Sequence, residues 1–583
     1  MVEVFGDRDD SSNPLAIPVI PTFGNNDILP HNIFLSGPNK WLKAYTDIWS
    51  NFIPEEQRHG FQRGGWFWVE VIPQKLAVFS LNTLYFFDHN AAVDGCALRS
   101  EPGYEHMEWL RIQLQFMRLR GLKAILTGHV PPARTDSKQL WDETCWQKYT
   151  LWLRQYRDVV VGGLYGHMNI DHFMLQDANE VDLLFIDGQS SKDQIIRALM
   201  DEELSIESAN DYLEELRENW SSLPNPSSAI KEYDEAESDI DNISKEATKQ
   251  KNKKGNKAKK DKRFKKIGGP WGERYQVTNV GPSVVPNYFP TLRVIEYNIT
   301  GLDKTSVWAN PAVSAQNQEL DWLDDDTDSS TMIMNEFLNE QLDFSDDESI
   351  ARKKKKHKKP KKPKNPDLIV PPPPSKSSPP GPAYSPQTLT LLGYTQYFAN
   401  LTHINNDDIV KPDEIDVSED KIDADKWHEG KHKGKHPKNK LPHPKPFQYE
   451  IEYDTFTDSI YKLKDMTVRS WLNLAHRIGQ YEPAKGDELN ETIPDGIKDG
   501  DDDFDEDDYD DDDDEEFGAE SGKKHREKKH HRKHEKNRVW LQFIKRAFIG
   551  TLGDEDLETF DQIPEPDVWA EETGSIDVHD GEL

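Results

Sequence analysis

The chain has 583 residues, of which 35% are hydrophobic and 31% are charged, and its formal net charge is −34. So large a charged fraction leaves much of the chain unable to form a hydrophobic core. The charges fall into separate lysine-rich and acidic blocks, a pattern typical of solvated linkers. No run of about 18 apolar residues occurs, and the first residues lack the basic and apolar regions of a signal peptide, so we expect neither feature in this sequence.

The predicted elements are concentrated in residues 15–185, where apolar runs alternate with helical patterns. In chain order they are a short buried strand at 17–22, paired strands at 75–87, a helix at 105–119 that Gly121 ends, a strand at 124–126, a helix at 142–156 and a strand at 159–161. Strands that alternate with helices predict an α/β fold.

Beyond residue 185, ordered segments alternate with charged insertions, so the folded unit must be assembled across long gaps. The predicted ordered parts are a partial domain at 1–185, C-terminal strands of the same fold at 268–310, an ordered segment at 381–402, a strand and a helix at 447–480 and a helix at 537–550. The predicted disordered or charged parts between them are an insertion at 186–267 with a helix at 192–217, an acidic and then Lys/Pro-rich linker at 311–380, a charged linker at 403–446 and an acidic and then basic stretch at 481–536. An acidic tail follows at 551–583.

The two cysteines, Cys96 and Cys145, exclude a disulfide-rich scaffold and a four-cysteine zinc site. They either pair in an oxidising lumen or remain as free buried thiols, and free thiols are the simpler expectation. Candidate glycosylation sequons begin at Asn219, Asn242, Asn298, Asn400 and Asn490. They are compatible with a secretory or vacuolar lumen.

Three candidate metal ligands, Asn25, His129 and His167, each follow an apolar run and a glycine. Ligands bind at the carboxyl ends of strands in α/β sheets, so the three side chains can converge. The preceding glycines allow the backbone to approach a metal or a phosphate closely. Imidazole and amide ligands suit Zn, Mn or Fe. One Gly-His pair alone would be an ordinary structural feature, but three such sites in this order favour a metal centre.

The motifs around these residues resemble those of fungal endopolyphosphatases, in the acid-sphingomyelinase-like branch of the calcineurin-like metallophosphoesterases. The matching stretches are GNND at 24–27, GHVPP at 128–132, GHMNID at 166–171, the segment 277–298, GPAYSP at 381–386 and the segment 461–478. The resemblance implies a metallophosphoesterase-type β-sandwich flanked by helices and incomplete at the N-terminus. It also implies a vacuolar enzyme that hydrolyses internal phosphoanhydride bonds of inorganic polyphosphate with divalent metal ions (Mn, Mg, Zn, Co or Fe).

Carried over residue by residue, the family pattern makes Asn25, His129 and His167 ligands of the second metal. Asn169 stands where the family has a histidine that binds the first metal, and its amide oxygen would bind more weakly. In the catalytic positions, Asn26 replaces the histidine that assists the leaving group, and an amide cannot deliver a proton. Asp27 is expected to hold the turn or a nearby histidine.

Two residues that follow the last motif, Asp171 and His172, either face the site or only end the loop.

The chain departs from the family pattern before Gly24, where the family has an Asp-x-His block and a Gly-Asp block. Gly6-Asp7 follows no apolar run, and the Asp-x-His at 577–579 lies in the acidic tail, so we expect neither to replace those blocks. Without a bridging carboxylate, two metals cannot be held about 3.5–4 Å apart. We therefore expect little or no hydrolysis. An N-terminally truncated sequence, whose missing part held a membrane anchor, is the first explanation, and a true pseudoenzyme is the second.

Partners follow from the same resemblance: inorganic polyphosphate is expected, self-association stays open, and no specific nucleic acid is expected. The lysine runs at 249–266, 353–364 and 523–536 would attract a polyanion, but we favour solvated linkers. Two alternative functions remain, a non-catalytic polyanion-binding protein and a sphingomyelinase-like phosphodiesterase. Gly-His-Met-Asn in place of Gly-His-Thr-His argues against the latter.

Overall fold

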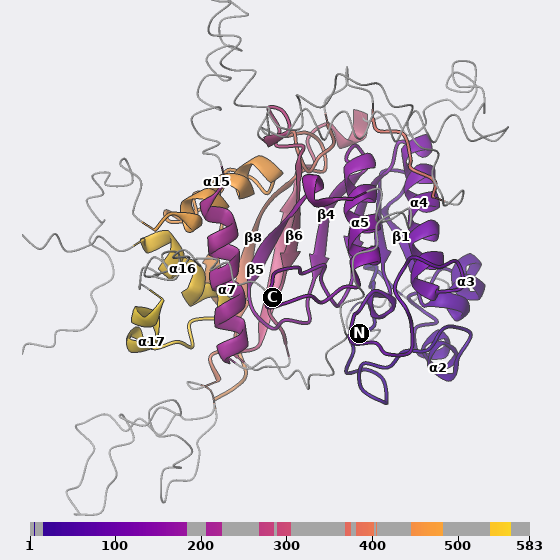
Figure 1. Cartoon of the computed structure of the whole chain (residues 1–583), viewed down its shortest axis with the longest axis horizontal. Helices are drawn as coiled ribbons and strands as arrows, with labels where there is room; N and C mark the ends of the chain where they lie inside the picture. The colour runs from indigo at the N-terminus through magenta and orange to yellow at the C-terminus, as the bar shows by residue number, and fades with distance from the viewer. Residues whose placement is uncertain are drawn as a thin grey trace, which may run out of the picture.

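The structure of the chain, a computed structural model, describes residues 15–182, 206–223, 267–284, 288–304, 368–374, 380–401, 445–481 and 537–560, together with Phe5 and Ile404. Outside these residues lie all three lysine runs, the Asp-x-His at 577–579, Asp7, the sequons at Asn242 and Asn490, and most of the predicted insertions. The described segments form a mixed α/β fold that contains two β-sheets (Figure 1).

The larger sheet has six strands in the order β1-β2-β3-β4-β6-β5. They are β1 (Phe67–Ile72), β2 (Leu76–Ser80), β3 (Lys123–Thr127), β4 (Val160–Tyr165), β5 (His172–Asp177) and β6 (Tyr275–Val280). The strands β2, β3, β4 and β6 run parallel, whereas β1 and β5 pair antiparallel at the two edges. The carboxyl ends of β2, β3 and β4 therefore meet at one edge of the sheet.

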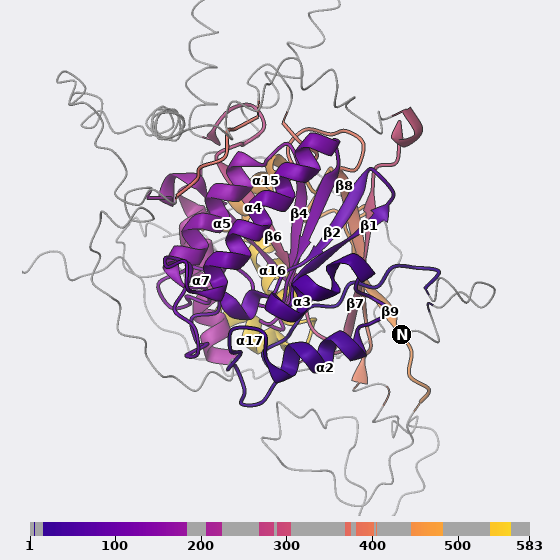
Figure 2. The ribbon, with the colours of Figure 1, turned by 90° about the vertical axis from the view of Figure 1, so that its right-hand side faces the viewer.

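The smaller sheet packs on one face of the larger sheet, opposite two helices. It consists of β7 (Thr291–Tyr297), β8 (Leu391–Phe398) and β9 (Glu450–Asp454). A side chain placed at Gly162 of β4 would meet Leu391 of β8, whereas one at Gly163 would face Tyr149 of helix α5. The layers are thus α4 (Pro102–Arg120) and α5 (Glu143–Gln155), then the six-stranded sheet, then the three-stranded sheet (Figure 2).

Local signals explain where these helices begin and end. α4 has Pro102 in its first turn and ends at Gly121, whose φ of 71° suits glycine in the left-handed region. Asp142 caps α5 by accepting a hydrogen bond from the backbone of Thr144. Both boundaries agree with the sequence prediction to within a few residues.

An aromatic cluster joins the N-terminal segment to the sheet. Phe23 is fully buried, and its ring lies 4.8 Å from the rings of Tyr45 and Trp49, 5.1 Å from Phe34 and 5.8 Å from Phe61. Tyr45 belongs to α2 (Lys40–Ile48) and Phe61 to α3 (Arg58–Gly64). Burying one large aromatic side chain contributes roughly 1.5–3 kcal/mol, so this cluster firmly anchors the residues that follow Phe23.

Three helices that follow β5 in the chain cover it: α7 (Ile206–Ser221), α15 (Val468–Gly479) and α16 (Arg538–Ala547) (Figure 1). The short helix α17 (Asp554–Thr559) packs against α16. The ring of Phe173 lies 4.7 Å from Trp220 of α7 and 4.5 Å from Trp471 of α15. Four short 3₁₀ helices complete the described elements: η1 (Glu55–Gln57), η2 (Thr83–Tyr85), η3 (Ala178–Glu180) and η4 (Leu302–Lys304).

Three predictions of local structure need correction. Residues 17–22 are extended but form no strand, because Pro18 and Pro21 have no N–H to donate to a sheet. Residues 75–87 contain one strand, β2, followed by η2 rather than a second strand. The helix predicted at 192–217 overlaps α7 over residues 206–217, but α7 continues to Ser221; the predicted start lies outside the described residues.

The expectation of free thiols is also wrong, because Cys96 and Cys145 form a disulfide across 49 residues of sequence. Both cysteines are fully buried. A side chain at Gly103, in the first turn of α4, would come within 2.8 Å of the Cys96 sulfur, so this glycine lets the cysteine loop pack against the helix. The disulfide fixes that loop to the first turns of α5.

None of the described helices is both long enough and apolar enough to cross a membrane.

Candidate metal centre

The loops that follow β3 and β4 run side by side at the carboxyl edge of the larger sheet. Backbone pairing continues beyond the strands, since Gly128 donates to the carbonyl of Leu164 at 3.2 Å and Gly166 donates to the carbonyl of His129 at 3.0 Å. The hydroxyl of Thr83 accepts from the backbone N–H of His129. His129 and His167 are therefore held as neighbours by the sheet itself.

The turn at residues 24–27 carries the third candidate ligand, Asn25, to the same place. The buried Phe23 anchors it on one side, and the backbone N–H of Gly24 donates to the carboxylate of Asp27 at 2.8 Å. A Cβ at Gly24 would lie 2.9 Å from that carboxylate and 3.4 Å from a ring carbon of His129. A side chain at this position would therefore crowd mainly the carboxylate of Asp27, which closes the turn.

Three donor atoms from these loops converge on one point. Asn25 Oδ1 lies 2.8 Å from His129 Nε2 and 3.1 Å from His167 Nδ1, and the two ring nitrogens are 3.2 Å apart. Ligand atoms about 2.0–2.1 Å from a tetrahedral zinc ion are roughly 3.3 Å apart. The three residues, which we name the ligand triad, therefore fit one divalent cation after only a slight opening.

Two further side chains orient the amide of Asn25. Its Nδ2 donates to Nε2 of His31 at 3.0 Å and to Oδ1 of Asn32 at 2.9 Å. With the amide nitrogen committed to these partners, its oxygen points to the two histidines. Outer partners of this kind fix the orientation of ligands in metal sites.

The loop after β4 has an unusual backbone conformation. His167 and Asn169 have φ values of 70° and 58°, and the N–H of Met168 donates to the carbonyl of Gly166 at 2.8 Å. This hydrogen bond closes a γ-turn with positive φ at His167, a rare and strained turn. Left-handed residues other than glycine persist where surrounding contacts hold them, and they cluster at functional sites.

Burial keeps both imidazoles of the triad neutral. Desolvation lowers the pKa of His129 to about 4, although the charge of Asp27 opposes this shift. The pKa of His167 lies well below its ordinary value because of burial, followed by the effects of His129, Lys138, His89 and His31. A neutral imidazole has a lone pair available for a metal ion.

The remaining predicted site residues lie around this triad. Asn26 is exposed at the turn, and Asp27 holds the turn through Gly24. Asn169 is partly buried, and no hydrogen bond joins it to the triad in the described part of the chain. Across the described ranges, no three His, Cys, Asp or Glu side chains form a group that could hold a metal, so the centre depends on two imidazoles and an amide.

Sequence reasoning missed several neighbours of the triad. His31 and His89 occur in no metal-binding pattern, and Lys138 is buried, with 5% of its surface exposed, in the loop between β3 and α5. The charges of Lys138 and of both imidazoles contribute to the lowered pKa of His167. No local sequence signal marks these three residues, because only the fold brings them to His167.

Asp171 and His172 turn away from the triad. Asp171 binds Arg293 of the smaller sheet, and His172 lies 3.2 Å from the hydroxyl of Tyr212 on α7. Of the two alternatives, facing the site or ending the loop, the structure therefore supports the second: both residues bind neighbouring elements at the end of the loop.

The described sequons differ in their surroundings. Asn219 is exposed on α7. Asn298 donates to the carbonyl of Gln387 and accepts from the backbone of Thr300, so both ends of its amide are bonded. Asn400 is partly buried just after β8.

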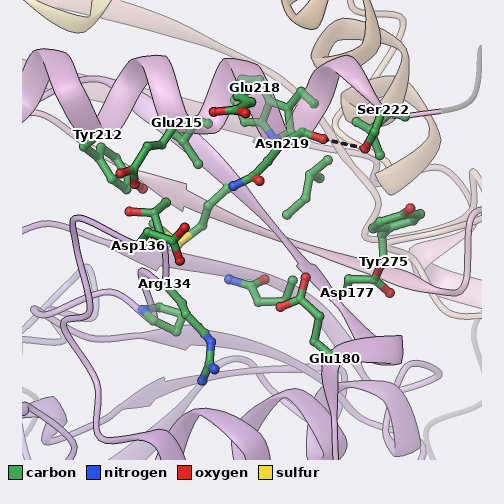
Figure 3. A pocket seen from close by; sticks show the side chains of 18 of the residues that line it. Arg134, Asp136, Asp177, Glu180, Tyr212, Glu215, Glu218, Asn219, Ser222 and Tyr275 are labelled. Carbon is green, nitrogen blue, oxygen red and sulfur yellow. Dashed lines mark hydrogen bonds between the residues drawn. The ribbon is translucent and has the colours of Figure 1, made fainter. Parts of the chain in front are cut away.

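A cavity of about 460 Å³ lies between α7, β5 and η3 (Figure 3). Pro132, from the same loop as His129, lies on its wall, but the triad does not. The lining carboxylates belong to Asp136, Asp177, Glu180, Glu215 and Glu218, and the guanidinium groups to Arg134 and Arg274. Both arginines form ion pairs, with Glu143 and Asp177 respectively. This acidic cavity disfavours a polyanionic ligand.

No protein-family model matches the chain. It is similar along most of its length to several curated fungal proteins. The endopolyphosphatase of Neurospora crassa is 50% identical over 500 residues, which are 83% of this chain and 64% of the relative. The endopolyphosphatase of Saccharomyces cerevisiae is 34% identical over 83% of this chain and 68% of the relative, and that of Yarrowia lipolytica is 30% identical over 82% and 70%. The chain spans about two thirds of the length of these relatives.

Proposed function

The chain belongs to the endopolyphosphatase family, and from this membership we propose that it acts on inorganic polyphosphate, cutting internal phosphoanhydride bonds with a divalent metal ion held by the ligand triad. The observation that carries the proposal is the convergence of Asn25 Oδ1, His129 Nε2 and His167 Nδ1 to within 2.8–3.2 Å of one another. The names of the relatives support the substrate class, and the geometry of the triad supports the proposal of a metal site.

The donor set indicates which ions suit the triad. Two imidazoles and one amide oxygen favour Zn, Co, Fe or Mn over Mg, which prefers oxygen ligands and retains its water. When bound, such an ion would supply Lewis-acid polarisation of a phosphoryl oxygen. The chain's own task is to hold three neutral donors in place and to keep both imidazoles unprotonated by burial.

Groups around the triad provide donors for phosphate oxygens. The charges of Lys138, His31 and His89 act on His167, and the amide of Asn26 is exposed at the neighbouring turn. An ammonium group and N–H donors bind phosphate by charge and by hydrogen bonds. These residues therefore support a polyphosphate chain that lies across the triad and away from the acidic cavity.

A second function, metal-dependent binding of polyphosphate without hydrolysis, is favoured by one observation. The triad is neutral, and the carboxylate of Asp27 already accepts a hydrogen bond from Gly24. Two-metal hydrolysis needs a carboxylate to balance and bridge the ions. We therefore propose that hydrolysis by this chain is slow and that metal and phosphate binding are its more robust properties.

A chain-length assay separates the two functions. Purified protein is titrated with Zn²⁺, Co²⁺ or Mn²⁺ and incubated with long-chain polyphosphate, which is resolved by gel electrophoresis. We expect metal binding and slow internal cutting, both lost in His129→Ala and His167→Ala and both retained in His59→Ala, since His59 is an exposed residue of α3. Metal and polyphosphate binding with no change in chain length would support the binding function, and absence of metal binding would refute both.

For the location of the protein we propose the vacuole. The buried disulfide between Cys96 and Cys145 supports an oxidising lumen, and the exposed Asn219 supports glycosylation in the secretory route. Expression in a fungal host of the whole native reading frame, including any codons upstream of Met1, with a tag at its C-terminus should give a signal inside the vacuole. Treatment with a glycosidase should shift its mobility on gels, with a smaller shift for Asn219→Gln. A cytosolic signal with no glycosidase shift would contradict this location.

A further inference from the structure

The loop that carries His167 is fastened at its far end by Asp171. This residue is 5% exposed, and both of its carboxylate oxygens are bonded. Oδ1 accepts from Nη2 of Arg293 at 2.5 Å, and Oδ2 accepts from the hydroxyl of Tyr453 at 2.5 Å. Arg293 belongs to β7 and Tyr453 to β9, so one carboxylate connects the ligand loop to two strands of the smaller sheet. The backbone N–H of Asp171 donates to the carbonyl of Ala547 in α16 at 3.1 Å.

The partners of Asp171 are themselves held in place. Nε of Arg293 donates to Gln396 at 2.8 Å, and its guanidinium lies 4.1 Å above the ring of Tyr394. The hydroxyl groups of Tyr394 and Tyr453 are 2.9 Å apart. Arg293 and Tyr453 are therefore both held by other contacts when they bind the carboxylate of Asp171.

The contacts of Asp171 matter for His167 because of the backbone that joins the two residues. Three residues lie between His167 and Asp171, and His167 and Asn169 both have positive φ values. Such a loop returns to ordinary extended or helical conformations unless its ends are fixed. Gly166 is fixed by the carbonyl of His129 at one end, and Asp171 provides the fixing at the other.

We propose that Asp171 is a positioning residue of the metal centre: by binding Arg293 and Tyr453 it holds the loop so that His167 Nδ1 points at the metal position. This inference rests on the proposed function for the identity of His167 as a ligand. The inference gives the smaller sheet a role in the metal centre. Its strands contribute no ligand, but both residues that bind the carboxylate of Asp171 belong to them.

The chain offers a matched control at the opposite end of the same strand. Asp171 directly precedes β5, and Asp177 is the last residue of β5, about 20 Å away along the strand. Asp177 also binds an arginine, Arg274, through two oxygens at 2.8 and 3.0 Å from its Nε. Both are partly or fully shielded carboxylate–guanidinium pairs, but only the pair at Asp171 adjoins the ligand loop.

The test compares Asp171→Asn and Tyr453→Phe with Asp177→Asn in the full chain. Affinity for Co²⁺ and Zn²⁺ is measured by calorimetry and by the visible spectrum of the bound Co²⁺, and thermal midpoints are recorded for each variant. We expect at least a tenfold loss of affinity in Asp171→Asn and a smaller loss in Tyr453→Phe. The metal affinity of Asp177→Asn should stay within twofold of the wild type, even if its thermal midpoint falls as far as that of Asp171→Asn. Equal affinities in all three variants, or an equal loss in Asp177→Asn, would overturn the proposal.

Hydrogen exchange of the metal-free protein provides a second readout, independent of metal binding. Amides at 166–171 should exchange faster in Asp171→Asn and Tyr453→Phe than in Asp177→Asn. Should the wild type bind no metal, the proposed function fails, and the exchange result alone decides whether Asp171 positions the loop. Unchanged exchange at 166–171 in Asp171→Asn would overturn the positioning role.

Discussion

Acid is expected to destabilise the fold through one buried histidine of α4. The side chain of His106 is fully buried, and its ring is stacked between Trp66, at 4.5 Å, and Phe86, at 4.7 Å. Burial lowers the pKa of His106 to about 3, although the backbone of Asn82 opposes the shift slightly. In the unfolded chain the same imidazole has its ordinary pKa of about 6.5.

The sign and size of the effect follow from this difference. Above pH 6.5 the imidazole is neutral in both states and stability is unaffected. As the pH falls from 6.5 towards 3, the unfolded chain binds a proton that the folded chain does not, so the free energy of unfolding decreases. For a folded pKa near 3, the loss at pH 5 is about 2 kcal/mol.

The variant His106→Phe isolates this contribution, because phenylalanine fits the slot between two aromatic rings and does not titrate. Urea unfolding of both proteins at pH 7.5 and pH 5.0 gives the pH-dependent change in the free energy of unfolding for each. We expect the wild type to lose about 2 kcal/mol more than the variant, since all other titrating groups are common to both. Equal losses would refute the assignment of the lowered pKa to burial of this ring.

Three further outcomes are expected. The double variant Cys96→Ala/Cys145→Ala should lower the free energy of unfolding by about 4 kcal/mol in the chain-entropy model, given the 49-residue separation, and a loss below about 1 kcal/mol in urea unfolding would contradict that estimate. Asn25→Asp adds a negative charge to a neutral triad, so calorimetry should show at least tenfold tighter Zn²⁺ binding; unchanged affinity would argue against Asn25 as a ligand. Gly24→Ala should weaken Zn²⁺ binding because a Cβ there would crowd the turn. Gly60→Ala should not, because a Cβ at Gly60 would have no other atom within 4 Å. Similar Zn²⁺ affinities of the two variants would exclude a steric role for Gly24.

The sequence contained enough information to predict the sheet edge on which the triad lies. The apolar runs before His129 and His167 became β3 and β4, which pair in parallel, so their carboxyl ends had to meet. Asn25 was predicted for the same edge although its preceding segment forms no strand. Its position depends on the buried ring of Phe23 and on a hydrogen bond from Ser80 to the carbonyl of Pro21, which keep the extended segment beside β2.

What the sequence could not predict depends on residues far apart in the chain. The charge of Lys138 acts on His167 from a different loop, and Arg293 binds Asp171 across 122 residues. The disulfide likewise required a loop and a helix to meet across 49 residues. Periodicity and turn signals act within roughly 20 residues, so they identify single elements and not the pairs that those elements form.

The bond from Tyr453 to Asp171 spans 282 residues, and this separation has a consequence for the chain while it is being made. At about 5–20 residues per second, a ribosome needs roughly 15–55 s to proceed from one partner to the other. Throughout that interval the nascent chain already contains Asn25, His129 and His167 but lacks the tyrosine that completes the support of their loop. On the proposal above, the ligand triad is thus expected to be among the last parts of the molecule to mature, although its residues are among the first to be synthesised.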